Sequence, residues 1–153
     1  LLTIFKWTTQ FYKNWKHTEQ NLKISKSKFN ELSSQIDQED QLIDLLLKNR
    51  NYKIKVSKIS LIKSEFGITK VFITNAEFYI FQGTLNKLFN ILPDKLFFQV
   101  SRDIILNKQS IESMASSTFG KISLTTNLLN TQELTVSRPK AASFRKWYHS
   151  NSA

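Results

Sequence analysis

A single arginine lies between two short apolar runs in the segment Phe97–Asn107, where the sequence most clearly offers a side chain to a partner. The apolar residues recur with a period near two, at Phe98, Val100, Ile104 and Leu106. This alternation predicts two short strands that share an apolar face, with Ser101 and Arg102 near the bend between them. A guanidinium at such a bend can be presented rigidly to a partner, although an arginine between strands is also commonly a solvated surface charge.

Enzyme chemistry has no support in the sequence. There is no cysteine, which excludes disulfides, thiolate nucleophiles and cysteine-bound metals. The two histidines, His17 and His149, lie at opposite ends of the chain without an acidic cluster beside them, which argues against a histidine metal site or a catalytic triad. Ser101 has no base close to it in sequence, and no glycine-rich phosphate loop occurs. We therefore expect no catalytic residue, metal, cofactor or small-molecule substrate.

The chain is strongly basic, and its charge is unevenly distributed. The formal net charge is +10 over 153 residues. Residues 1–49 hold seven lysines against six acidic residues, whereas residues 50–153 hold fifteen basic against six acidic residues. A compact domain with that basic excess attracts polyanions, either nucleic acid or an anionic membrane surface, although a basic surface can also serve only solubility.

The first residues combine aromatic and basic side chains. Trp7, Phe11, Tyr12 and Trp15 are interleaved with Lys6, Lys13 and Lys16. This pattern is typical of the polar edge of a bilayer, but it equally suits an amphipathic helix that packs on the domain or on a partner. The run is far shorter than the roughly 20 apolar residues of a spanning helix. If this run does meet a membrane, it is therefore only the cytoplasmic end of a tether that lies upstream of Leu1.

A heptad pattern follows. Leu22, Phe29, Ile36 and Ile43 are seven residues apart, and Leu32 and Leu46 lie three residues after two of them. The spacing predicts a helix to about Asn49, which either forms a short, loose two-stranded coiled coil or packs on its own domain. Leu42–Leu47 is apolar nearly all round and is expected to be the buried end of this helix.

After Asn51 the apolar period changes from 3.6 to two, which marks a domain boundary. Strands are predicted at 52–57, 59–63, 68–74, 77–81, 110–115, 121–126 and 133–137, in addition to those flanking Arg102. Thr84 is expected to cap a short helix that ends before Pro93, and a final helix is expected to begin at Arg138-Pro139. We expect a helical segment at 1–49, a mainly β domain at 50–148 and a tail at 149–153.

Three segments of this domain stand out together: "ISLIKSEFGITKVFI", "TLNKLFNILPDKLFFQVSRDIILNKQSIESM" and the closing "LTVSRPKAASFRKWY". They resemble a LytTR-type DNA-binding domain, the output module of many bacterial transcription regulators. The resemblance implies a mainly β fold of small antiparallel sheets with one short internal helix and a C-terminal helix. It also implies that loops, rather than a helix, enter successive major grooves of DNA.

The resemblance further implies where bases and phosphates would be contacted. Base contacts are expected from Thr69 and Lys70, from Ser101 with Arg102, and from Arg138. Arginine suits this role because it can form a bidentate bond with guanine O6 and N7. Phosphate contacts are expected from Lys108, Lys121, Lys140, Arg145 and Lys146, together with the start of the final helix. An ion pair with Glu133 is the structural alternative for Arg138.

The sequence departs from the family pattern at Asp103, which follows Arg102 directly. Its carboxylate either orients the guanidinium or neutralises it. We expect a bacterial, two-component-like regulator that binds double-stranded DNA as a homodimer through its N-terminal helix, in the cytoplasm or on the cytoplasmic face of the inner membrane. The alternative is a membrane-proximal signalling or interaction module that binds anionic lipid or a protein partner without binding DNA.

Overall fold

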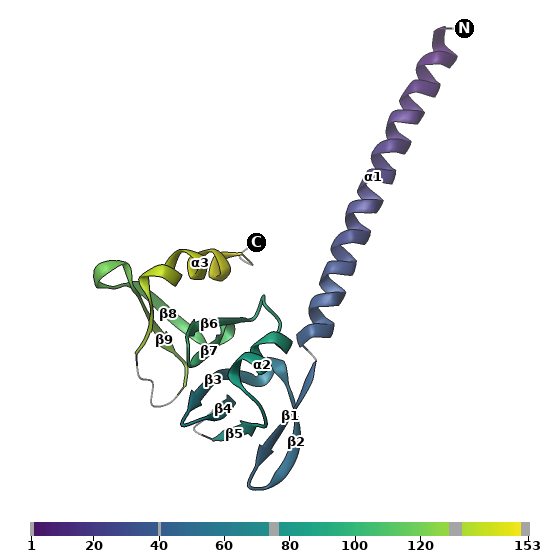
Figure 1. Ribbon diagram of the computed structural model, residues 1–153. Coiled ribbons are helices and arrows are strands. Elements are labelled where there is room, and N and C mark those ends of the chain that lie inside the picture. The colour runs from purple at the N-terminus through teal and green to yellow at the C-terminus, as the bar shows by residue number, and fades with distance from the viewer. Residues whose placement is uncertain (1, 40, 74–76, 129–132, 151–153) are drawn as a thin grey trace. The chain divides into compact units, whose positions relative to one another are not determined.

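The computed structural model describes residues 2–39, 41–73, 77–128 and 133–150. The chain divides into two compact units, Leu1–Gln38 and Glu39–Ala153. The first is helical and the second carries all the strands (Figure 1). The predicted fold class, a mainly β domain preceded by an N-terminal helix, is confirmed.

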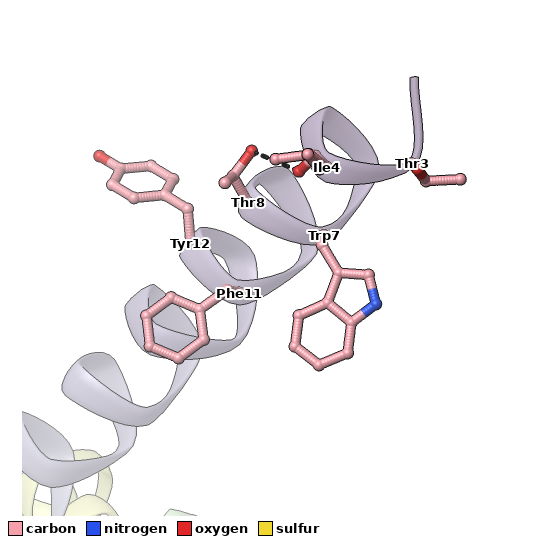
Figure 2. Close-up of a pocket in the computed structure, with 6 residues that line it drawn as sticks. All are labelled: Thr3, Ile4, Trp7, Thr8, Phe11 and Tyr12. Atoms are coloured by element: carbon pink, nitrogen blue, oxygen red, sulfur yellow. Dashed lines mark hydrogen bonds between the residues drawn. The ribbon is translucent and has the colours of Figure 1, made fainter. Parts of the chain in front are cut away.

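The first unit is the helix α1 (Leu2–Glu39). Many of its large apolar side chains are exposed: Ile4, Phe5, Trp7, Phe11, Tyr12, Trp15, Leu22, Ile24, Phe29 and Leu32. Figure 2 shows the aromatic rings near its start projecting away from the helix axis, while the hydroxyl of Thr8 donates to the carbonyl of Ile4 at 3.2 Å. No helix in the described ranges is long and apolar enough to cross a membrane.

The prediction that this helix continues to Asn49 is wrong. Leu42–Leu47 is instead the strand β1, which pairs antiparallel with β2 (Arg50–Lys55). Lys48 and Asn49 join the two strands with φ values of 46° and 63°, the left-handed backbone of a two-residue hairpin turn. Periodicity cannot distinguish a short buried strand from a buried helix. Here pairing with β2 in the hairpin makes Leu42–Leu47 a strand. Ile43 therefore belongs to the core of the domain and not to the heptad pattern.

Seven strands form one antiparallel sheet in the order β2-β1-β5-β4-β3-β7-β6 (Figure 1). Its other members are β3 (Ile59–Glu65), β4 (Ile68–Ile73), β5 (Phe78–Phe81), β6 (Phe97–Ser101) and β7 (Ile104–Asn107). A short 3-10 segment, η1 (Val56–Lys58), joins β2 to β3. Strands β3 to β7 were predicted from the sequence. The predicted break at Asn75-Ala76 lies outside the described residues.

One face of this sheet packs against the short helix α2 (Leu85–Ile91). The hydroxyl of Thr84 accepts a hydrogen bond from the backbone N–H of Lys87 at 3.2 Å, which confirms the predicted cap. Leu85 and Leu88 are buried with apolar residues of β1, β3, β4 and β7. This apolar core supports the sheet on the face opposite the second sheet and the last helix.

The other face carries a second sheet and the last helix. The second sheet has the order β10-β9-β8, with β8 at Ile111–Ser116, β9 at Ile122–Thr126 and β10 at Leu134–Val136. Two 3-10 segments, η2 (Lys108–Ser110) and η3 (Thr118–Gly120), flank β8. The helix α3 (Arg138–His149) follows β10 and has its proline in the first turn, as predicted. Most of the predicted loop after Thr126 lies outside the described residues.

A second apolar core joins α3 to both sheets. It contains Phe98, Val100, Ile104 and Leu106, which confirms that these alternating residues share one face. Phe98 meets Phe144 edge to face at 5.3 Å between ring centroids and meets Trp147 at 5.2 Å. The indole N–H of Trp147 donates to the carbonyl of Asp94 at 2.8 Å. Phe144 is completely buried, so α3 is held firmly against strand β6.

Candidate nucleic-acid interface

The turn between β6 and β7 presents Arg102 to solvent. The side-chain amide of Gln99 donates to the carbonyl of Arg102 at 3.3 Å, and the N–H of Asp103 donates to the hydroxyl of Ser101 at 3.3 Å. These bonds fix the turn while leaving the guanidinium exposed. In the part of the chain that the structure describes, no ion pair joins Arg102 to Asp103. The carboxylate therefore does not neutralise the guanidinium by direct contact.

The hairpin of β3 and β4 lies beside this turn. The N–H of Ser64 donates to the carbonyl of Asp103 at 2.8 Å, so the end of β3 is bonded directly to the β6–β7 turn. Thr69 is 3% exposed, and its hydroxyl donates to the carbonyl of Gly83 at 2.8 Å. The side chain of Thr69 thus points inward and stabilises the hairpin. Because Thr69 points inward, the residues next to it are better placed than Thr69 itself to contact a ligand.

Lys70 is partly engaged within the same hairpin. Its ammonium donates to Glu65 at 2.8 Å and lies 4.9 Å from the ring centroid of Phe78. Hydrogen bonds from Lys70 and then from Lys63 lower the pKa of the Glu65 carboxyl below its usual value. Glu65 therefore offsets positive charge at this hairpin, where the resemblance implies a base contact.

The start of α3 brings two more cations to the same side of the domain. The ammonium of Lys140 donates to the carbonyl of Gln99 at 3.0 Å, which joins the first turn of α3 to β6. The aliphatic stem of Arg138 lies against the β8–β9 turn, because a Cβ added at Gly120 would be 3.3 Å from its Cγ. Glu133 accepts a hydrogen bond from Ser123, and no ion pair with Arg138 is seen among the described residues.

These contacts link four segments into one surface, which we call the basic loop edge. It comprises the β3–β4 turn, the β6–β7 turn, the first turn of α3 and the β8–β9 turn (Figure 1). Of the residues expected to contact DNA, the edge holds Lys70, Ser101, Arg102, Lys121, Arg138 and Lys140. The cations among them are separated in sequence but are carried by segments that contact one another in the fold, an arrangement that suits a polyanion.

The other three predicted phosphate contacts have different surroundings. Lys108 is half-buried, its ammonium donates to the carbonyl of Trp147 at 2.6 Å, and it lies 4.6 Å from the indole centroid. Burial lowers the pKa of Lys108. Arg145 is exposed and reaches the hydroxyl of Ser116 at 3.5 Å, and Lys146 is exposed on α3. Lys108 thus also helps to hold α3 in place.

Two features of the edge escaped the sequence reasoning. Gln99 organises it by bonding to both Arg102 and Lys140, through groups 3 and 41 residues away. Phe66 and Phe119 stand almost fully exposed at the tips of the β3–β4 and β8–β9 turns. Each precedes a glycine, and that Phe-Gly repeat was the available signal. Among the described residues, no cluster of histidine or acidic side chains could hold a metal ion.

The fold and the edge together define a β-rich nucleic-acid-binding domain whose cations are carried by turns and by the start of a helix. The family model described as LytTr DNA-binding domain matches residues 49–149. Because this match covers most of the chain, the chain belongs to the LytTR family of DNA-binding domains, as predicted.

A comparison with solved structures supports the same fold. The chain is similar to the LytTr DNA-binding domain of a putative methyl-accepting/DNA response regulator from Bacillus cereus, with a TM-score of 0.61 and 21% sequence identity. The match covers 69% of this chain and 94% of that one. Comparison with curated proteins gave no match.

Proposed function

We propose that this chain is a non-enzymatic transcription regulator that reads a specific sequence in double-stranded DNA through the basic loop edge. The observation that carries the proposal is that Gln99 bonds to both the Arg102 carbonyl and the Lys140 ammonium, which joins the β6–β7 turn to the first turn of α3. Arg138 lies in that same first turn, and its stem packs against Gly120 of the β8–β9 turn. Arginines at turns can enter the major groove and bind guanine in bidentate fashion, while lysines beside them hold phosphates.

The residues of the edge take different roles in this proposal. Arg102 and Arg138 read bases, with Lys70 and Ser101 beside them in neighbouring turns. Thr69 supports the β3–β4 hairpin through its bond to Gly83. Lys121, Lys140, Arg145 and Lys146 contact phosphates, and Lys108 contributes charge from beneath α3. Ser137 makes no side-chain cap to α3. Pro139 has no N–H, and the N–H of Lys140 donates to the carbonyl of Ser137 at 3.0 Å, so a phosphate at the start of this helix is held mainly by the cationic side chains.

The test uses the full chain and a library of randomised duplexes at fixed salt. We expect selection of a defined sequence, and Arg138→Ala should lose about 1 to 3 kcal/mol on selected sites and relax one base position. Arg50→Ala is the matched control, because Arg50 is also exposed but lies on β2, at the opposite end of the sheet from β6. No enrichment by the wild-type chain would refute sequence-specific reading, and equal losses in both variants would refute the role of Arg138.

We further propose that α1 pairs two copies of the chain, so that two domains read a repeated site. Exposed apolar residues continue the heptad towards the start of the helix, since Trp15 lies seven residues before Leu22 and Phe29 seven after it. Large exposed side chains at that spacing are typical of a coiled-coil seam. Pairing raises apparent affinity because the second domain acts at a high effective concentration.

Leu22→Lys should give a monomer in sedimentation equilibrium and weaken binding to two-site duplexes far more than to single sites. Ile24→Lys is its matched control, because Ile24 is 53% exposed, close to the 57% of Leu22, but lies on the other side of the helix. A dimer that persists with Leu22→Lys, or a wild-type chain that is monomeric at all concentrations, would refute pairing through this seam.

One observation favours a second function. The rings of Trp7 and Tyr12 are exposed at the start of α1 (Figure 2). In the sequence they are interleaved with Lys6, Lys13 and Lys16, a composition suited to an anionic lipid surface. Pelleting with phosphatidylserine vesicles, run in parallel with the DNA assay, tests it. Lipid binding without selective DNA binding would support the membrane-proximal module instead of the regulator.

A further inference from the structure

Consecutive left-handed residues occur at three hairpin turns in the described part of the chain. They are Lys48-Asn49 between β1 and β2, Phe66-Gly67 between β3 and β4, and Phe119-Gly120 between β8 and β9. The φ values of Phe119 and Gly120 are 58° and 74°. Turns of this kind favour Asn, Asp or Gly at both central positions, because other side chains are strained there. All three turns meet this preference at the second central position, with Asn49, Gly67 and Gly120. At the first position they place a disfavoured side chain, which is a lysine in the β1–β2 turn and a phenylalanine in the other two.

Phe119 is disfavoured in its turn on two counts. Its backbone is left-handed, and its side chain is 84% exposed to water. Among the described residues, the Phe119 ring pairs with no other aromatic ring and belongs to neither apolar core. A strained residue that contributes no packing points to a role outside the folded domain. The same description holds for Phe66, which is 96% exposed.

The surroundings of Phe119 indicate what kind of partner its ring meets. Gly120, the next residue, lies against the stem of Arg138. Lys121 follows directly, and Arg145 of α3 reaches Ser116 at the end of β8. The exposed ring therefore stands on a hairpin that carries or contacts three cations. Such a hairpin is suited to a polyanion that also offers apolar groups, and the major groove of DNA offers one in the C5-methyl group of thymine.

We propose that Phe119 is a specificity-determining residue that contacts the methyl group of a thymine next to the base read by Arg138. This inference rests on the proposed function, since it assigns a further contact to the same DNA interface. It adds the β8–β9 turn to the base-reading loops that the family resemblance implied. The two contacts are assigned to neighbouring bases because Gly120, the residue that follows Phe119, packs against the stem of Arg138.

The test exchanges single thymines for deoxyuridine in the selected duplex, which removes one methyl group at a time. Binding of the full-length chain is measured by fluorescence anisotropy at fixed salt. For wild type, one exchange should lower affinity about fourfold, the value expected for one buried methyl group. Phe119→Ala should lower affinity on the thymine duplex by at least as much and should not respond to that exchange. A Phe119→Ala variant that responds as wild type does, or a wild type insensitive at every thymine, would overturn the proposal.

Two further variants separate contact from folding. Phe119→Asn should raise the midpoint of thermal unfolding, because asparagine tolerates the left-handed backbone, while losing the response to the methyl group. Phe66→Ala is the matched control, since Phe66 has the same left-handed turn and is also highly exposed, but a Cβ at the neighbouring Gly67 would have no atom of Arg138 within 4 Å. It should retain that response at the same thymine. If wild type selects no sequence, the proposed function fails. If selection succeeds and Phe119→Asn keeps the response, this inference alone fails.

Discussion

Gly120 and Gly67 form a matched pair that tests how Arg138 is positioned. Both are left-handed, with φ of 74° and 75°, but a Cβ at Gly120 would lie 3.3 Å from Cγ of Arg138, whereas one at Gly67 would have nothing within 4 Å. Alanine in this conformation costs about 1 to 2 kcal/mol. Reduced entropy of the unfolded chain offsets roughly half of that cost. Each variant should therefore lose about 1 kcal/mol, or roughly 4 °C in the unfolding midpoint.

The two variants should differ in DNA recognition. The stem of Arg138 is flexible, so it can yield by a few tenths of an ångström to a methyl group at Gly120, with little extra loss of stability. The guanidinium then moves with the stem, and discrimination at the base assigned to Arg138 should fall by about 1 kcal/mol, or roughly fivefold. Gly67→Ala should leave that base unaffected.

Thermal unfolding and competition binding against duplexes mutated at that base measure both quantities. A much larger loss of stability for Gly120→Ala than for Gly67→Ala would show that the stem of Arg138 cannot yield. Unchanged discrimination in Gly120→Ala would show that Gly120 does not set the position of the guanidinium. Either result would refute the reasoning.

Three further predictions concern stability and charge. Asn107→Ala should destabilise the domain by about 2 to 4 kcal/mol in urea unfolding, because the buried side chain donates to the carbonyl of Ile59 at 2.6 Å and accepts from the N–H of Gln109 at 2.9 Å. Glu65→Gln should strengthen non-specific DNA binding and steepen its salt dependence, since it removes a negative charge from the edge. The pKa of Glu65 is lowered from 4.5, so the stabilising effect of its carboxylate is complete above pH 4.5 and is lost as the pH falls through the lowered pKa. The melting midpoints of wild type and Glu65→Gln should therefore converge in acid. Phe144→Ala should cost about 3 to 5 kcal/mol and loosen α3, seen as faster hydrogen exchange in that helix.

The strands were predictable because their signal is local. Alternating residues such as Val100 and Leu106 lie on one face whatever the sheet pairs with, so the sequence alone places them correctly. The run Leu42–Leu47 has no such alternation, and its state depends on pairing with Arg50–Lys55 across a turn. The helix prediction failed there because a tertiary contact, rather than the apolar pattern, determines the structure.

The candidate site was predictable only in part, for a related reason. Resemblance to the family indicated Arg102 and Arg138 as separate points in the sequence. Gln99, which joins the Arg102 turn to Lys140 of α3, and Gly120, which packs against Arg138, carry no signal of these contacts in the sequence. Likewise, nothing in the pattern around Thr69 shows that its hydroxyl is bonded to Gly83.

The basic loop edge is assembled from both sheets, so its geometry depends on how α3 is held between them. Phe98 of β6 contacts Phe144 and Trp147 of α3, and Lys140 bonds to Gln99, the residue that follows Phe98. Packing of these rings therefore sets the separation of Arg102 from Arg138. Lys108 also helps to hold α3 in place, because its ammonium lies over the ring of Trp147. Changes in this aromatic cluster should thus alter the spacing between the bases that we propose the two arginines read, and not only the stability of the domain.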